Sequence, residues 1–467
     1  MEIGNTTLVN EINAVLNSGV KPVHFYWEAA ILAGGKLHAP RNLVSIDIIC
    51  DYAGAYADEM LLTVTIGGGT FSREIVPFKE DLKVILFKNP IGEVTDNLDV
   101  EGGSAQQEFR ATLTEVPTET TQPATPQNQD VETGNLVSLR TVTLALQDAS
   151  LEQLRTMTFG TTVRRTTPAQ VLRAFVTQVS KSINVDLTNK IKGITMVPEH
   201  NTEARDHIVI PHGTPLFSLA DYLQDKAGGI YGSGLGFYLR KDMWYVWPLY
   251  DLSRFDTTPK TVTFILLPAN QFNSVERTFR TTANQLIVLI TGGATHQDNS
   301  EQQLMNAGNG VRFTDSRRVI EGFGEVKDNR VVAKRSFNNS EFVGVERSTG
   351  LNNVAARGPT NNVYSETSRL AKGKGSLMTV HWQNSDPDLL RPDMPAQVIY
   401  LDGEMPKTLN ASLLQAHTFI SSPTNTLTDH RHTSSTAVTL FVDKDLPEFK
   451  DYEATTNPAQ PTQSLAV

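Results

Sequence analysis

Residues 43–69, LVSIDIICDYAGAYADEMLLTVTIGGG, decide the fold class of this sequence. They contain two runs rich in Val, Ile and Leu, at 43–50 and 60–66, and the second run ends at three glycines, which signal a turn. Short runs of alternating character, separated by Gly, Pro and Asn, are typical of an antiparallel meander or a small barrel. Three later runs extend this prediction: TFSREIVPF (70–78), DLKVILFK (81–88) and EFRATLTEV (108–116).

The next segment, residues 117–135, changes character. It is rich in Pro, Thr, Gln and Asn and has almost no large apolar residues, so it cannot bury enough surface to offset the entropy of ordering. We expect an exposed hairpin loop, after which LVSLRTVTLALQD (136–148) returns to the same barrel. Residues 1–148 are therefore predicted to form a first β domain that the loop interrupts.

The pattern then becomes helical, and residues 149–258 are predicted to form an α/β middle domain. Ser150 is a candidate cap for SLEQLR, and Thr167-Pro168 is a helix-start signal before an apolar face at helical spacing. Thr214-Pro215 repeats this signal, and Gly228-Gly229 is expected to end that second helix.

Residues 237–251, FYLRKDMWYVWPLYD, indicate an aromatic hairpin that turns at Lys241-Asp242. It carries Trp244 and Trp247. Such a hairpin could stack nucleic-acid bases or sugars, but large rings at alternating positions more often form core. We favour the core interpretation.

Strand patterns return in residues 259–446, which are predicted to form a second β domain. Strong candidates are 261–268 and 284–293, and an antiparallel series follows, with a hairpin signal at Asp402-Gly403: 376–382, 396–402, 411–421 and 436–443. Residues 294–376 are poor in long apolar runs, so we expect an irregular insertion there. Residues 447–467 are polar with two prolines and are predicted to be a mobile tail.

The composition argues against several classes of protein. The chain has 467 residues, 39% hydrophobic and 20% charged, with a net charge of −10. That acidity argues against a protein whose task is to grip nucleic acid, because phosphate binding needs clustered Lys and Arg. One cysteine, Cys50, excludes an intramolecular disulfide framework, and its apolar surroundings favour a buried, inert thiol over a nucleophile. Neither a signal peptide nor a membrane span is expected.

The sequence lacks the common catalytic motifs. No phosphate loop, nucleophile elbow or H-E-x-x-H helix occurs. The most metal-like cluster is Asp429, His430 and His432, which His417 could join from a neighbouring strand. We favour exposed histidines in a polar hairpin loop, so the sequence assigns no catalytic, cofactor or metal residues.

Carboxylate pairs also occur, and glycosidases use two carboxylates across a cleft. The pairs are Asp58 with Glu59, Glu80 with Asp81, and Asp386 with Asp388. Proximity in sequence says nothing about that geometry, and several pairs are expected by chance in so acidic a chain.

Three stretches resemble the central baseplate hub proteins of contractile phage tails. In the first, a strand is followed by D-Y-x-x-x-Y-x-D-E (Asp51 to Glu59) and later by a P-x-x-x-D-L turn (Pro77 to Leu82). In the second, residues 208–251, an I-P-x-G-T segment caps a helix and an aromatic hairpin follows. The third, RPDMPAQVIYLDGEMPKTLNASLLQAHTFIS with STAVTLFVD, resembles closing barrel strands. Together they cover about half of the chain.

The resemblance implies a mainly β chain with two tail-tube-like antiparallel barrels around a small α+β domain. It implies a homotrimer whose six barrels match the sixfold tail tube on one side and a threefold central spike on the other. The implied neighbours are tube and terminator-proximal ring proteins, spike, baseplate wedge and tape measure proteins. DNA would pass through the lumen at ejection without specific binding, and the chain would be made in the host cytoplasm, enter the virion and not insert into a membrane.

The main alternative is a receptor-binding or carbohydrate-binding β-rich tail protein, including one with glycosidase activity. It predicts an aromatic-lined cleft in a monomer, whereas the hub interpretation predicts a trimer without turnover. An enzyme with an unrecognised site would gain support if residues 429–432 held a metal.

Overall fold

We describe the protein from a computed structural model of the chain. The structure describes residues 2–17, 24–91, 105–114, 139–183, 190–258, 260–267, 277–297, 310–313, 324–327, 330–333, 341–344, 364, 367–368, 371–372, 375–402, 405–422 and 432–443. The predicted loop at 117–135 and the predicted tail at 447–467 lie outside these residues.

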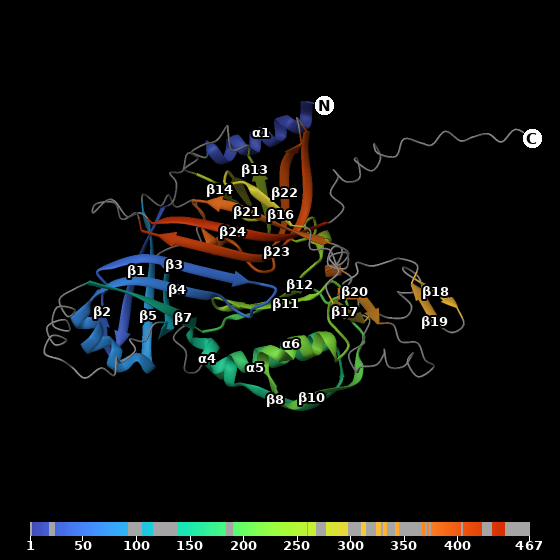
Figure 1. The fold of residues 1–467 in the computed structure, drawn as a ribbon, viewed down its shortest axis with the longest axis horizontal. Coiled ribbons are helices and arrows are strands. Elements are labelled where there is room, and N and C mark those ends of the chain that lie inside the picture. Colours follow the sequence, from blue (N-terminus) through green and yellow to red (C-terminus); the bar gives the residue numbers. More distant parts are fainter. Residues whose placement is uncertain are drawn as a thin grey trace, which may run out of the picture.

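The protein is mainly β with an α/β insert, as the sequence predicts, and one large sheet of fifteen strands joins its two ends (Figure 1). The first β unit, residues 24–148, contributes seven strands in the order β3-β4-β7-β6-β5-β1-β2. Their bounds are β1 His24–Ala33, β2 Lys36–His38, β3 Asn42–Asp51, β4 Glu59–Gly67, β5 Leu82–Ile91, β6 Ala105–Leu113 and β7 Leu139–Asp148. Since β6 pairs with β7, the segment between them does interrupt a single unit.

The strand predicted at 70–78 is wrong. These residues form short helical turns: α2 (Gly68–Thr70), η1 (Phe71–Ile75) and η2 (Val76–Asp81). Phe71 and Ile75 are both buried. Arg73, midway between them, is exposed. In a strand all three side chains would lie on one face, whereas in a helix residues four apart share a face that the residue between them does not.

The α/β unit, residues 149–258, packs three helices between a two-stranded ribbon and a three-stranded sheet. The elements are α4 Ala149–Thr156, β8 Thr158–Thr166, α5 Pro168–Ile183, β9 Gly193–Met196, β10 Arg205–Pro215, α6 Leu216–Asp225, β11 Leu235–Arg240, β12 Met243–Pro248 and η3 Leu252–Arg254. β8 pairs with β10 in the ribbon, and β11-β12-β9 form the sheet. The aromatic hairpin is confirmed as core, because Trp244 and Trp247 are fully buried.

Helix starts agree with the sequence in one case and differ in two. Thr167 caps α5 through its side-chain oxygen, which accepts from the N–H of Gln170. The cap of α4 is Asp148 rather than Ser150, because the Asp148 carboxylate accepts from the Ser150 N–H. Thr214 does not cap α6: it is still paired in β10, and α6 begins after Pro215.

The second β unit, residues 259–443, supplies the remaining strands of the large sheet. Their bounds are β13 Thr261–Leu266, β14 Phe279–Thr281, β15 Gln285–Ile290, β16 Ala294–Gln297, β21 Gly375–Gln383, β22 Pro395–Asp402, β23 Met405–Ser421 and β24 Thr433–Asp443, with η6 at Pro387–Leu389. The predicted antiparallel series is confirmed in β21 to β24. β13 differs, because it runs parallel to both β15 and β22.

Part of the predicted insertion at 294–376 is described. Beyond β16 it contains two separate pairs of short strands, β17 with β20 and β18 with β19. Their bounds are β17 Gly310–Phe313, β18 Gly324–Lys327, β19 Arg330–Ala333 and β20 Glu341–Gly344. None of these four strands pairs with the large sheet.

The two β units are joined by strand pairing. One edge of β23 pairs first with β22 and then, beyond a register shift at Leu413, with β3 of the first unit. Seven residue pairs, from Gln415–Asp51 to Ser421–Ser45, form the second ladder. One apolar core runs through both units across this joint and includes Ile46 and Leu413.

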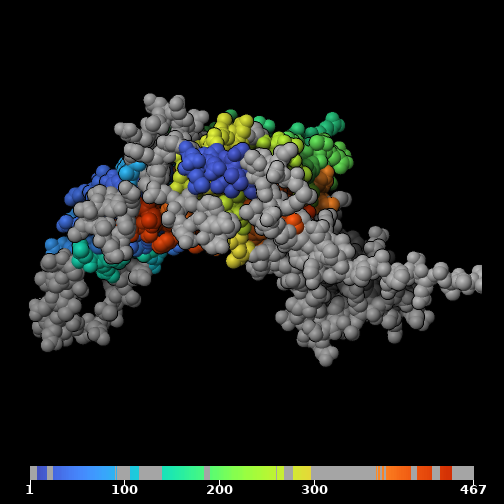
Figure 2. Space-filling model, turned by 90° about the horizontal axis from the view of Figure 1, so that it is seen from above, coloured from blue at the N-terminus to red at the C-terminus, as the bar shows by residue number. Residues whose placement is uncertain are grey.

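Helix α1 (Glu2–Leu16) was not predicted. Although it lies near the N-terminus in the sequence, it packs on the second β unit. Its Leu8 and Val15 pack on Ile265 and Leu289, on the face of β13 and β15 that points away from the main core. Figure 2 shows this helix in blue across the yellow strands. Among the described residues, no helix is long and apolar enough to cross a membrane.

Candidate functional site

The D-Y-x-x-x-Y-x-D-E motif lies where the two β units and the α/β unit meet. It spans the end of β3, a turn and the start of β4. The Asp51 carboxylate accepts from the N–H groups of Ala53 and Gly54 at 3.1 and 3.0 Å and so fixes the turn. We call the contacts of this motif, together with Lys88, Arg240 and residues 386–390, the three-way junction.

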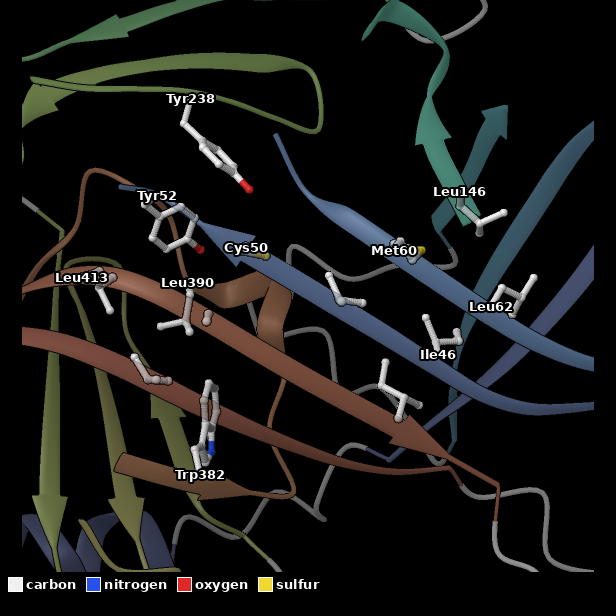
Figure 3. Packing of buried hydrophobic residues seen from close by; sticks show 14 of the residues in the cluster. Ile46, Cys50, Tyr52, Met60, Leu62, Leu146, Tyr238, Trp382, Leu390 and Leu413 are labelled. Atoms are coloured by element: carbon white, nitrogen blue, oxygen red, sulfur yellow. The ribbon is translucent and has the colours of Figure 1, made fainter. Parts of the chain in front are cut away.

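Arg240, the last residue of β11, is the centre of this junction. Its guanidinium is 6% exposed and donates to the Tyr52 hydroxyl at 2.7 Å in the first β unit. It also donates to the carbonyls of Pro387, at 2.7 Å, and of Leu390 in the second β unit. One cation from the α/β unit thus holds groups from both other units. Figure 3 shows the Tyr52 and Tyr238 rings close to each other, with Leu390 near Tyr52.

The rest of the motif contacts the α/β unit. Asp58 accepts from the Tyr238 hydroxyl at 2.9 Å and lies 3.8 Å from the Arg240 Nε. Tyr56 donates to Asp221 of α6 at 2.8 Å, and its ring stacks on Phe217. Burial and the Asp221 carboxylate raise the pKa of Tyr56 to about 12, so the hydroxyl stays a donor at neutral pH.

A second charged group, the Lys88 cluster, joins the two β units directly. Lys88 of β5 is 3% exposed and donates to Asp386 at 2.7 Å and to Asp388 at 2.6 Å. Its ammonium also lies 3.9 Å from the centre of the Phe25 ring. Lys241 of the hairpin turn reaches Asp388 at 3.1 Å, so the cluster also touches the α/β unit.

The two carboxylates of the Lys88 cluster differ in pKa. Burial alone would raise the pKa of Asp388, but the charges of Lys88 and Lys241 outweigh burial and lower the pKa well below its usual value. For Asp386, burial outweighs the Lys88 charge and the pKa is raised. Burial would lower the pKa of Lys88, but Asp388 and Asp386 raise it, so the ammonium stays charged.

The junction borders a small cavity on one side and an open groove on the other. A cavity of about 50 Å³ is lined by Trp27, Asp58, Arg240 and Asp388 among others. A groove of about 530 Å³ runs between β3, β4 and β7 of the first unit and α4 and α6. Its lining includes Tyr56, Glu59, Arg155 and Phe217.

The contacts of the three-way junction hold the three units together. A charged or hydroxyl partner from another unit contacts each of these charged groups: Lys88, Arg240, Lys241, Asp58, Asp221, Asp386 and Asp388. Cys50 lies beside the motif and is fully buried, and burial raises the pKa of its thiol well above the usual value. A buried thiol with a raised pKa is a poor nucleophile, in agreement with the inert role that we predicted.

The structure describes two of the four metal candidates, His417 and His432, whereas Asp429 and His430 lie outside the described residues. The prediction of exposed histidines is wrong for His432, which is buried and whose Nδ1 accepts from the Trp27 N–H at 3.3 Å. His417 lies in β23 and contacts Asp47 of β3. Among the described residues, no group of three or more His, Cys, Asp and Glu side chains could hold a metal ion.

The carboxylate pairs act as partners of cations and hydroxyl groups. Asp386 and Asp388 both hold Lys88, Asp81 accepts from Arg110 at 2.7 Å, and Asp58 contacts Tyr238 and Arg240. Sequence reasoning missed the cations of the junction. A signal was present for Lys88, since β5 buries every second residue from Leu82 and Lys88 is in that phase.

Comparisons with known proteins give structural likeness without sequence matches. No family model matches the chain. No curated protein matches it significantly either. Several solved structures are similar to it.

Three of these structures show the extent of the likeness. A tail protein from Neisseria meningitidis MC58 is 13% identical, covers 90% of this chain and 97% of its own, and has a TM-score of 0.44. The 43 kDa tail protein of prophage MuSo2 from Shewanella oneidensis is 11% identical over 88% and 96%, again with a TM-score of 0.44. The E. coli c3393 protein, a component of the type VI secretion system, is 6% identical over 87% and 76%, with a TM-score of 0.39.

Proposed function

We propose that this chain is a structural virion protein, a homotrimeric baseplate hub that joins a sixfold tail tube to a threefold central spike and lines the DNA ejection channel. One observation carries the proposal: a single chain joins two β units through the β23–β3 ladder into one sheet. Two such units per chain, copied three times, would place six β units around the threefold axis.

The three-way junction supports a mechanical role. A protein between a tube and a spike transmits force, so its units must keep a fixed relation. Arg240 and Lys88 connect the units through buried, charge-assisted hydrogen bonds, which are short and depend strongly on direction. The residues that carry the resemblance to hub proteins, Asp51, Tyr52, Tyr56 and Asp58, are the ones that make these contacts or shape their turn.

We propose that the chain has no catalytic role. Of the carboxylate pairs that a glycosidase could use, Asp386 and Asp388 are both engaged by Lys88, and one member of each other pair contacts an arginine. The net charge of −10 would favour passage of DNA without adhesion. The proposed location is the tail baseplate, next to tube, spike, wedge and tape measure proteins.

Light scattering coupled to size exclusion tests this proposal on the full chain at micromolar concentration. A hub would give a mass of about 154 kDa, three times the 51.4 kDa of one chain. A strictly monomeric protein would contradict it and favour the receptor- or carbohydrate-binding alternative. Incubation with a panel of oligosaccharides should leave them intact, and their hydrolysis would refute the absence of catalysis.

A further inference from the structure

The Lys88 cluster holds an amine and a carboxyl group in contact in a closed part of the protein. The Lys88 Nζ lies 2.7 Å from a carboxylate oxygen of Asp386, and the two side chains are only 3% and 4% exposed. They belong to different β units and stand 298 positions apart in the sequence. A covalent bond between them would therefore tie the first β unit to the second.

The arrangement of these two groups suits the formation of an amide. The carboxyl carbon of Asp386 lies one bond beyond the oxygen that Lys88 contacts, so the nitrogen has a short path to it. The carboxyl group is held in place, because the same oxygen accepts from the Asp388 N–H at 3.1 Å. Well-oriented groups of one molecule react as if their concentration were about 10⁵–10⁸ M.

The surroundings favour the uncharged forms that react. Phe25 and Trp27 are both buried, and the centres of their rings lie 3.9 and 5.7 Å from the Lys88 Nζ. Apolar surroundings penalise an ion pair relative to a neutral amine beside a carboxylic acid. Burial raises the pKa of Asp386, so this carboxyl group takes up a proton more readily than an exposed one.

The ion pair between Lys88 and Asp386 is the state before the reaction. Burial would lower the pKa of Lys88, but the charges of Asp388 and Asp386 outweigh burial and raise it, so most molecules hold an ammonium. A proton that moves from the Lys88 Nζ to Asp386 along their hydrogen bond produces the neutral amine. Because the reaction occurs once in each chain, a small neutral fraction is sufficient.

Asp388 is in position to carry a second proton. Its carboxylate contacts the same Lys88 nitrogen at 2.6 Å. Burial would raise the pKa of Asp388, but the charge of Lys88 is the largest of the causes that lower it. Once the nitrogen is neutral, this effect disappears and Asp388 becomes a stronger base. A carboxylate held against the reacting atom can then act as general base and general acid.

The product would contain fewer buried charges and would leave none of them alone. An amide between Lys88 and Asp386 is neutral, so the desolvation cost of their ion pair is relieved. Asp388 keeps Lys241, whose Nζ lies 3.1 Å away. The cavity of about 50 Å³ that Asp388 and Trp27 line exceeds the roughly 10–15 Å³ that one water needs, so it can receive the released water.

We propose that Lys88 and Asp386 form an isopeptide bond, with Asp388 as the proton carrier. The Lys88 Nζ attacks the Asp386 carboxyl carbon, so that a C–N bond forms and a C–O bond breaks. The ammonium loses two protons: one passes directly to Asp386, and the other passes through Asp388 to the leaving hydroxyl, which departs as water. The reaction needs no oxidant and no cofactor. The bond closes a covalent loop from residue 88 to residue 386, and it does not depend on the proposed hub function.

Mass spectrometry tests the bond on the full chain, purified and held at 37 °C and pH 7 for two days. The intact mass should be lower than the mass of the sequence by one water molecule. A tryptic digest should contain a branched peptide that joins residues 88 and 386. Lys83 is the internal control: it contacts Glu108 at 2.9 Å from the same strand but is 42% exposed, so no branched peptide should join these two residues.

Two variants assign the roles of the side chains. Lys88→Arg keeps a cation beside both carboxylates, but a guanidinium stays protonated and is not a nucleophile, so this variant should keep the full mass. Asp388→Asn should slow the appearance of the branched peptide at least about tenfold, because an amide cannot carry the proton. The matched control is Asp81→Asn, at a carboxylate that is 77% exposed and pairs with Arg110, and it should not change the rate.

The wild-type digest decides the outcome even if a variant fails to fold. A chain with the full mass and no branched peptide refutes the proposal. Loss of water without a branched peptide also refutes it, as does a branch at Asp388 in place of Asp386. A bond that forms as fast in Asp388→Asn as in wild type refutes the role of Asp388. A monomeric chain that carries the bond would contradict the hub proposal and leave this inference standing.

Discussion

The β23–β3 ladder joins the two β units through backbone hydrogen bonds, whereas the three-way junction joins the units through buried charged side chains. The first is the ladder of seven residue pairs between β23 and β3, with one apolar core on its inner side. The second depends on Arg240, Asp58 and Tyr52, with Lys88 beside them.

The difference predicts unequal tolerance to substitution. Backbone pairing survives the loss of a side chain, since every non-proline residue keeps its N–H and C=O. When a buried charged side chain loses its partner, the free-energy cost of its desolvation remains, and no favourable interaction offsets that cost. The charged joint should therefore fail at single residues where the ladder does not.

The largest effect is expected for Lys88→Met. It leaves Asp386 and Asp388 without their buried cation and should lower the free energy of unfolding by about 3–5 kcal/mol, measured by urea denaturation. Lys83→Met is the matched control in the same strand: Lys83 is 42% exposed and pairs with Glu108, so its loss should cost under about 1 kcal/mol. K88M/D386N/D388N should recover part of the loss, and equal effects of K88M and K83M would contradict the comparison.

Tyr52→Phe should come next. It removes the hydroxyl that accepts from the buried Arg240 guanidinium, a hydrogen bond to a charged group that contributes about 1.5–3 kcal/mol. Tyr222→Phe is the control, because the Tyr222 hydroxyl donates to a neutral carbonyl, that of Val209, at a more exposed site. Thermal unfolding should show a clearly larger decrease in Tm for Y52F than for Y222F. A smaller decrease for Y52F would contradict the stabilising role assigned to the hydrogen bond of Arg240.

Acid should weaken the junction through Asp388. Its pKa is lowered in the folded protein, so its contribution is present above the usual Asp value of 3.8 and is lost as the pH falls below it. The loss is at most about 1.4 kcal/mol per pH unit for one proton. Asp386 acts with the opposite sign, since its raised pKa means that protonation relieves a cost. Urea denaturation from pH 7 to pH 3 should therefore give a shallower decline for Asp388→Asn than for wild type, and identical slopes would exclude this role.

The smallest effect is expected for His417→Ala in the backbone joint. The His417 ring contacts Asp47 across the β23–β3 ladder, but its side chain is 47% exposed. Loss of this pair should change the free energy of unfolding by less than about 0.5 kcal/mol. A loss above about 1 kcal/mol would show that the ladder also depends on side-chain charges and would remove the contrast between the joints.

Local patterns in the sequence predicted local structure well. The aromatic hairpin, the α5 start at Thr167 and the strands of both β units followed from spacing and turn residues, because each depends on neighbours within a few positions. The strand prediction at 70–78 was wrong because a spacing of four, as between Phe71 and Ile75, fits one face of a helix as well as one face of a strand.

Long-range contacts could not be predicted in the same way. Pairing of β23 with β3 joins residues 370 positions apart, as for His417 and Asp47, and no local pattern specifies it. The charged junction is a similar case: the motif at Asp51 to Glu59 was singled out, but its partners Arg240 and Leu390 come from distant elements. Lys88 alone had a local signal, its place in the buried phase of β5.

Electron cryo-microscopy of the purified full chain tests the central claim most directly. If two joined β units are repeated threefold, class averages down the symmetry axis will show a ring of six β lobes around a channel, with three α/β units attached. A particle that contains a single copy of the chain would contradict this claim. A threefold ring in which the two β units of each chain do not occupy equivalent positions around the axis would also contradict it.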